Sequence, residues 1–337
     1  MDLIKDMRYN VMLALYFPIL LYAFSTFDLS DDVYVVDSVQ PVVVGEQTVM
    51  LGQPFEARAF LAIGGSGAPV LTGEEGLQVV GDSLFRMATG ALLADDQTEA
   101  SVPYRGTFAF QQIGGATSQI PVAGTFTVRR PEIVAQSEAA TALYRQSRNT
   151  LRFDVPGLED RQLRLDAGGQ RVDGRSITLS PAGGGASVRV YLAGDNGADD
   201  VYLGSKSFVA IDPPRPEIRV TSAGRELRNG DNLPKARAML AFQITPDEQF
   251  RARFPQDARY GTGRATVHLR QGLAASRELG TFALDGGQLV LTQALRDARP
   301  GDRVTVVLNG VHRINHAGQA IAVPFSAGSL TFGFVVS

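Results

Sequence analysis

The chain of 337 residues has no cysteine and no tryptophan. Without cysteine there can be no disulfide bond, no thiol nucleophile and no cysteine-based zinc site. Each domain must therefore be held together by apolar burial and hydrogen bonding alone. The hydrophobic share of 44% is large enough for packed cores, and the length allows roughly two or three domains.

Strong net charge is also absent. The formal net charge is −3 at neutral pH, and lysine is scarce, with only Lys5, Lys206 and Lys235. Basic residues do not form runs interleaved with aromatic residues, although such runs are typical of nucleic-acid-binding proteins. We therefore expect no nucleic acid among the partners of this chain.

Glycine and proline are abundant and separate short runs of apolar residues, which favours β-sheets joined by turns. Alternation of apolar and polar residues starts at Phe55–Ile63 and recurs to the end of the chain. It is interrupted at Arg129–Pro131 and at Asp212–Pro216, where three prolines favour a semi-rigid extended linker. The predicted fold is mainly β, with three tandem β-sandwich (Ig-like) domains over residues 33–131, 132–216 and 217–337.

One short helix is predicted inside the last domain. Leu291, Leu295 and Ala298 recur at helical spacing, and Thr292 can cap the first turn. Pro300, followed by a glycine, would end the segment before the next strand.

The N-terminal region carries the only long apolar run. Residues 9–27 contain no charge, and a helix of this length would span about 28 Å, close to the hydrocarbon thickness of a bilayer. Pro18 in its middle predicts a kink. Lys5 and Arg8 precede the run and Asp28 follows it. The positive-inside rule therefore places residues 1–8 in the cytoplasm and the bulk of the chain in the periplasm, with 9–27 as a single inner-membrane span.

Two other interpretations of the run stay open. Ala23-Phe24-Ser25 has the small-x-small pattern of a signal-peptide cleavage site, and a cleaved chain would be exported without an anchor. A buried core helix is the third possibility, although nothing nearby in the sequence could cover a run that is apolar on all faces.

Candidate catalytic and metal sites are weak. His312 and His316 are four residues apart, which would suit a metal only on a helix, and a hairpin turn is the alternative. The acidic stretch from Gly194 to Asp200 lacks the order of a calcium loop and also suits a polar hairpin. His268 has no comparable neighbour, and Ser, His and Asp occur at no interpretable spacing. We expect no enzyme, no cofactor and no bound metal.

Several stretches occur in a telling order along the chain: YNVMLALYFPILL (9–21), VVVGEQTVMLGQPFEARAFLA (42–62), TLRFDVPG (150–157), LGSKSF (203–208) and LRDARPGDRVTVVLNGVHRINHAGQAIAVP (295–324). Together they resemble the GldM family, called PorM in non-gliding relatives, of gliding motility and the type IX secretion system. Family members carry a long helical domain where this chain has only residues 25–41. The resemblance therefore implies a short variant that lacks the helical periplasmic domain.

The resemblance implies an ion-gradient-driven rotary motor that powers protein secretion, gliding motility or both. In it, a pair of membrane helices sits inside a ring of GldL-like polytopic partner subunits, and the paired periplasmic domains carry the motion outward. It thus implies a homodimer, an inner-membrane location and contact with outer-membrane-associated secretion components. Alignment on Asn10 and Met12, which with Pro18 mark helix packing in the membrane, places Lys5 where the family has a basic residue that pairs with an intramembrane glutamate.

The role of the basic residues before the apolar run has alternatives. Arg8 lies one helical turn deeper than Lys5 and is the other candidate for ion coupling and partner pairing. Both residues could instead only set the topology. The alternative function for the whole chain is an exported, signal-peptide-cleaved β-sandwich protein that binds or scaffolds through loops at its domain ends and has no motor activity.

Overall fold

The structure is a computed structural model that describes residues 40–61, 69–111, 116–137, 142–194 and 199–337. Of these residues, 56% lie in strands and 3% in helices, which confirms the expectation of a mainly β protein. Within these ranges no helix is long and apolar enough to cross a membrane. The predicted span at 9–27 lies outside the described residues.

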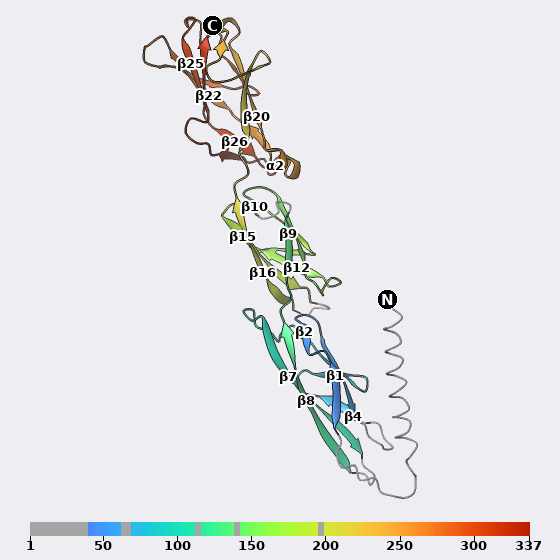
Figure 1. Ribbon diagram of the computed structural model, residues 1–337. Coiled ribbons are helices and arrows are strands. Elements are labelled where there is room, and N and C mark those ends of the chain that lie inside the picture. Colours follow the sequence, from blue (N-terminus) through green and yellow to red (C-terminus); the bar gives the residue numbers. More distant parts are fainter. Residues whose placement is uncertain (1–39, 62–68, 112–115, 138–141, 195–198) are drawn as a thin grey trace, which may run out of the picture.

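The first domain consists of two four-stranded sheets that share one core (Figure 1). The first sheet has the order β1-β3-β6-β5, with bounds Pro41–Gly45, Phe55–Leu61, Leu84–Met87 and Gln78–Val80. The second has the order β2-β8-β7-β4, with bounds Thr48–Met50, Thr117–Arg129, Glu99–Gln111 and Val70–Gly73. The sheets meet through stacked rings of Phe55 and Phe126, whose centroids are 3.9 Å apart. This arrangement is consistent with a β-sandwich.

The second domain packs a five-stranded sheet against a three-stranded sheet. The larger sheet has the order β10-β16-β15-β12-β13, with bounds Leu143–Tyr144, Val201–Ile211, Gly185–Leu192, Leu163–Ala167 and Gln170–Asp173. The smaller sheet has the order β14-β11-β9, with bounds Ser176–Leu179, Asn149–Asp154 and Val134–Ser137. Its core is continuous with that of the first domain, so the two domains share one apolar cluster.

The third domain has its own core between a four-stranded and a five-stranded sheet. The first has the order β18-β17-β20-β24, with bounds Arg225–Leu227, Glu217–Ser222, Met239–Thr245 and Gln288–Val290. The second has the order β19-β28-β25-β22-β23, with bounds Asn232–Leu233, Thr331–Val336, Arg303–Leu308, Arg264–Arg270 and Arg277–Ala283. A small third sheet, β21-β26-β27, has bounds Arg259–Gly261, Val311–Ile314 and Ala320–Val323.

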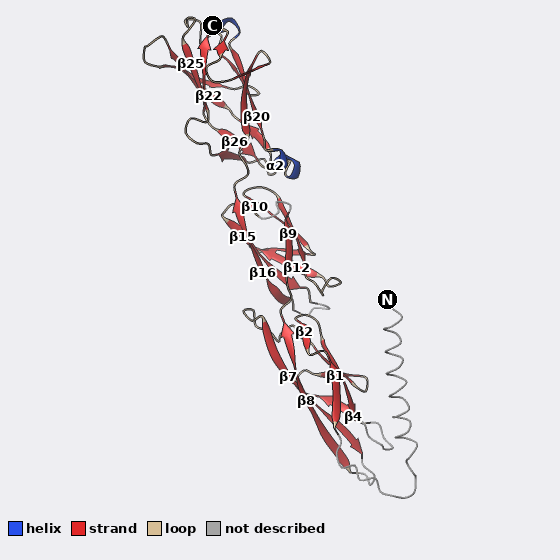
Figure 2. Cartoon of the chain, viewed as in Figure 1, coloured by secondary structure: helices blue, strands red, loops and turns tan. Residues whose placement is uncertain are grey.

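Helices are short and confined to the third domain within the described ranges (Figure 2). Helix α2, Glu248–Arg253, begins at Asp247, whose carboxylate accepts a hydrogen bond from Phe250 N–H at 2.8 Å. The other is the 3-10 helix η1, Lys235–Arg237. A capped helix is stable here because its apolar residues pack against the second domain rather than because of its length.

The helix predicted near Leu291 is wrong. Leu291, Leu295 and Ala298 are buried as their spacing suggested, but residues 292–297 form consecutive turns. The Leu295 N–H donates to the Leu291 carbonyl, while the Ala298 N–H donates to Leu295, so the backbone tightens before a second helical turn can form. An apolar repeat of only three residues does not overcome the cost of helix nucleation.

The three domains follow one another end to end, and the C-terminus lies at the end of the rod away from the first domain (Figure 1). Such a rod is only as stiff as its two joints. The contacts at these joints therefore decide whether the domains can move relative to one another.

Candidate functional site

The residues predicted to act in the membrane lie outside the described part of the chain. These are Lys5, Arg8, Asn10, Met12 and Pro18. The other candidates are described, and two of them, His312 and His316, lie at the joint between the second and third domains.

This joint begins with a small aromatic cluster. Helix α2 directs Phe250 and the following Phe254 toward Tyr144 of the second domain. The Tyr144 ring meets both rings edge to face, with centroid distances of 5.1 and 5.3 Å. Both phenylalanines are almost fully buried. Aromatic pairs in this geometry are attractive beyond their apolar burial, so the cluster favours one relative orientation of the two domains.

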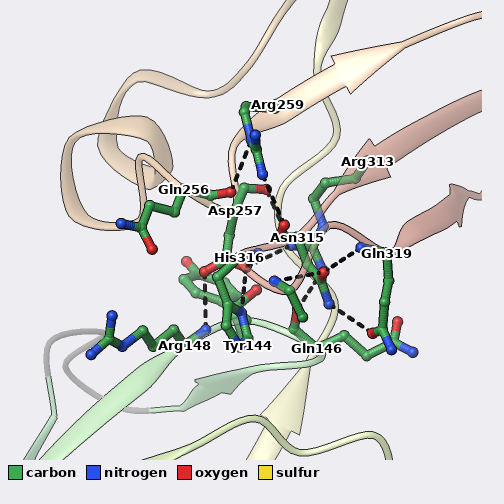
Figure 3. A network of polar contacts seen from close by, with 12 residues as sticks. Tyr144, Gln146, Arg148, Gln256, Asp257, Arg259, Arg313, Asn315, His316 and Gln319 are labelled. Atoms are coloured by element: carbon green, nitrogen blue, oxygen red, sulfur yellow. Dashed lines mark hydrogen bonds and ion pairs between the residues drawn. The ribbon is translucent and has the colours of Figure 1, made fainter.

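Beside the aromatic cluster lies a buried carboxylate, Asp257 (Figure 3). It accepts hydrogen bonds from the backbone N–H of Arg148 at 3.0 Å and of His316 at 2.9 Å. The Nδ1 atom of His316 lies 3.1 Å from the same carboxylate, and Arg313 Nη1 lies 3.6 Å away. Because Arg148 belongs to the second domain and the others to the third, one carboxylate ties the two domains together.

Arg313 extends the connection from the other side. Its guanidinium donates to the carbonyls of Arg145 and Gln146 in the second domain, at 3.0 and 3.3 Å, and to the carbonyl of Asp257 at 3.1 Å. Burial lowers the pKa of Arg313 from its ordinary value. A buried arginine is tolerated only when its donors are satisfied, and here backbone carbonyls of both domains satisfy them.

The proline-rich linker is held as well. The Tyr260 hydroxyl donates to the Pro214 carbonyl at 3.3 Å, and Arg145 pairs with Asp212 at 3.1 Å. Burial raises the pKa of Tyr260 to about 12. The linker between the domains is thus both stiffened by its prolines and fastened to the domains on each side.

The joint between the first and second domains is also close. Arg130 donates to the carbonyls of Ala94, Gln97 and Tyr202, at 2.6, 2.9 and 2.9 Å. Gly52 has a φ of 93°, and a Cβ atom there would lie 2.7 Å from Leu192 Cδ2 of the second domain. Only glycine fits here without strain. The close approach of Gly52 to Leu192 allows the cores of the first and second domains to pack against each other.

Of the remaining sequence candidates, the histidine stretch and Asp200 can be placed, whereas residues 195–198 of the acidic stretch lie outside the described residues. His312 lies in β26, and His316 lies in the turn that joins β26 to β27. The stretch therefore forms a hairpin, which was the alternative to a metal site on a helix. Asp200 is held by Arg164 at 2.6 Å. Burial opposes its ionisation, but the Gly194 N–H and the Arg164 guanidinium hold the pKa of Asp200 below its ordinary value. The described residues contain no His, Asp and Glu cluster that could bind a metal.

Residues 214–333 match the family described as GldM C-terminal domain. This part of the chain belongs to the GldM family. The match begins in the proline linker and covers Asp257, Arg313 and His316, so the third-domain half of the joint lies within the GldM domain.

Other comparisons are distant. No curated protein matches the chain. Among solved structures, a tetra-tandem repeat in the extending region of a large adhesion protein shares 12% identity, over 88% of this chain and 75% of that one, with a TM-score of 0.28. A marsupial T cell receptor shares 9% identity, over 86% of this chain and all of that one, with a TM-score of 0.19. At these TM-scores neither likeness carries an argument about function.

Sequence reasoning missed the joint network. The spacing of His312 and His316 indicated a metal site or a hairpin turn, and neither interpretation gave a role to Arg313 between them. The usable signal was its position, because Arg313 alternates with Val311 on the buried face of a strand. A charged residue at a buried strand position requires partners, and those partners proved to belong to another domain.

Proposed function

We propose that this chain is a GldM-like periplasmic shaft or scaffold of an ion-gradient-driven rotary motor that powers type IX protein secretion, gliding motility or both. Residues 9–27 anchor it in the inner membrane, with residues 1–8 in the cytoplasm. The GldM domain at residues 214–333 supports the family context.

The observation that carries the proposal is the joint around Asp257 and Arg313. A shaft transmits rotation only if its segments do not turn freely about one another. Inter-domain contacts are mobile by default unless they are extensive and well packed. In this chain a buried ion pair, an aromatic cluster and a fastened proline linker act at the same joint. This design suits the transmission of torque better than the reversible capture of a ligand.

The proposed assembly is a homodimer that works with a GldL-like membrane partner and with outer-membrane-associated secretion components. Support for the homodimer comes from the outward face of the first-domain sheet β1-β3-β6-β5, where apolar side chains are exposed. The residues of this face are Val42, Val44, Phe60, Val80 and the half-buried Leu84. Strand register places them on one side of the sheet, although an outward face is ordinarily polar.

Charges on this face are self-complementary. Arg58 and Glu46 line the same shallow groove of about 660 Å³, and neither makes an ion pair with any described residue. A twofold axis between them would set each Arg58 against the Glu46 of the other copy. A second copy of the chain is therefore the proposed occupant of the face.

The proposal is tested first by the intact mass of the native protein. Retention of residues 1–25 would support the anchor, whereas a mature N-terminus near Thr26 would contradict the motor and leave an exported β-scaffold. The second test is secretion or gliding by Lys5→Ala and Arg8→Ala variants. Loss of function in an assembled dimer is expected, and full activity in both single variants and in the double variant would exclude ion coupling through these residues.

A further inference from the structure

The third domain ends away from the joint in a group of neighbouring segments, called here the distal end. It contains the β22–β23 hairpin, the 3-10 helix η1 and the segment between β24 and β25. Hydrogen bonds link them, because Gln271 Nε2 donates to the Asp297 carbonyl at 3.4 Å and Lys235 Nζ donates to the Ala298 carbonyl at 2.9 Å.

The distal end is basic. Arg270 and Arg303 stand directly opposite each other on β22 and β25, and like charges in this position destabilise a sheet. The exposed arginines of this end that make no ion pair with any described residue are Arg237, Arg270, Arg277, Arg299 and Arg303. Arg296 pairs with Asp297 at 3.4 Å. The distal end therefore carries positive charge that no described ion pair neutralises. The repulsion between Arg270 and Arg303 lowers the stability of the third domain.

Acidic side chains offset this charge only in part. Asp302 is buried and accepts a hydrogen bond from the Arg299 N–H at 2.8 Å, and Asp297 is already paired. Glu278 is exposed and lies opposite His268 on the outward side of β22. An approaching anionic surface would thus meet several arginines that have no other partner.

The same end exposes apolar side chains. Leu273, in the loop of the β22–β23 hairpin, is 96% exposed, and its neighbours Gly272, Ala274 and Ala275 are exposed as well. On the adjacent sheet, Met239 and Val290 form an exposed cross-strand pair, and the Leu291 N–H bonds to the Ala238 carbonyl next to it. This end therefore combines exposed apolar side chains with the arginines at positions 270 and 277, and an apolar patch rimmed by charge is typical of an interaction site.

We propose that the distal end binds an anionic lipid surface, with the Leu273 loop entering the interfacial layer and the surrounding arginines contacting lipid phosphates. Arginine suits phosphate because its donors match two oxygens at once. A lipid surface is favoured over an acidic protein because the loop over residues 271–276 has no aromatic anchor of the kind that dominates protein interfaces. Non-directional apolar insertion with surrounding basic charge is the chemistry of membrane interfaces.

The test uses the absence of native cysteine. A single Ala274→Cys substitution in the full chain carries an environment-sensitive fluorophore, and the protein is mixed with vesicles of phosphatidylcholine alone or with 30% phosphatidylglycerol, roughly the regime in which polybasic segments bind. A blue shift with the anionic vesicles only is expected. The same label at Ala182→Cys, in an exposed turn of the second domain, reports attachment through any other part of the chain and should not shift.

Substitutions separate the two contributions. Arg270→Gln with Arg303→Gln should weaken the apparent vesicle affinity about 30-fold, and Leu273→Gln about 10-fold or more. All three residues are exposed, so the fold should be retained. The absence of a shift at position 274, an equal shift with both vesicle types, or unchanged binding by Leu273→Gln would overturn the proposal.

Discussion

The carboxylate of Asp257 in the third domain accepts a hydrogen bond from the backbone N–H of Arg148 in the second domain, at 3.0 Å. The same carboxylate faces the buried guanidinium of Arg313, which bonds to two second-domain carbonyls. The Asp257 side chain thus makes one direct link between the domains and also holds the arginine that makes two more. Relative movement of the domains would have to break these bonds together.

Asp257→Asn should loosen the joint strongly. The substitution keeps the shape of the side chain but leaves the buried Arg313 without its counter-charge, a change that typically costs about 3–5 kcal/mol. Hydrogen exchange of peptides covering residues 145–148 and 311–316 should accelerate by roughly 100-fold or more.

The matched control is Asp212→Asn. Asp212 pairs with Arg145 at the same joint, but its side chain is 61% exposed, so its loss should cost less than about 1 kcal/mol. Adding Arg313→Met to Asp257→Asn should recover part of the protection, because the uncompensated charge is removed. Equal exchange in Asp257→Asn and wild type would contradict the role given to the buried pair.

Tyr144→Leu should widen the range of angles between the second and third domains. The substitution removes two edge-to-face contacts, each worth about 0.5–1.5 kcal/mol beyond burial, while leaving the polar network intact. Because the chain has no cysteine, spin labels at Ala182→Cys and Ala283→Cys report one inter-domain distance. The distribution should be narrow in wild type and broad in the variant. Tyr191→Leu, which removes an outward-facing ring away from the joint, should leave it narrow.

Most strands could be predicted from the sequence, because each strand buries one face and its apolar and polar residues therefore alternate. In β3 the burial alternates residue by residue from Phe55, and the predicted strand at 55–63 matches it closely. Apolar and polar residues also alternate over 303–314, but this stretch forms two strands, β25 and β26, because Gly310 takes a φ of 120° that turns the chain. Local patterns therefore located the strands better than the breaks between them.

The joint was not readable from the sequence, because its contacts join residues that are far apart. The Arg313 guanidinium bonds to Arg145, 168 positions away along the chain. The local sequence around Arg313 does not indicate that Arg145 is its partner, and the sequence around Arg145 does not indicate Arg313. Likewise, the aromatic partner of Tyr144 lies on α2, a helix too short for its periodicity to show. Sequence periodicity identifies a buried face but not the element that covers it.

High pH should weaken the joint through Tyr260. Burial raises the pKa of Tyr260 to about 12, from an ordinary value of about 10. The folded state therefore keeps the neutral phenol, and this contribution to stability is fully present below pH 10 and lost as the pH rises to 12. The loss should be about 1–2 kcal/mol, measured by urea unfolding at pH 8 and at pH 11–12. Tyr260→Phe should lose less, and an equal loss in both proteins would contradict this account.

The outward face of the first-domain sheet should crosslink two copies of the chain. Val44 and Val42 lie on β1 and are 62% and 56% exposed, and a disulfide forms only where two cysteines approach within about 7 Å between Cα atoms. Because no native cysteine competes, Val44→Cys or Val42→Cys should give a disulfide-linked dimer under oxidising conditions, visible on a non-reducing gel. The matched control is Ala123→Cys, on the outward side of the other sheet, which should stay monomeric. A dimer that forms through Ala123→Cys, with none through the β1 positions, would keep the homodimer but move its interface to the opposite sheet.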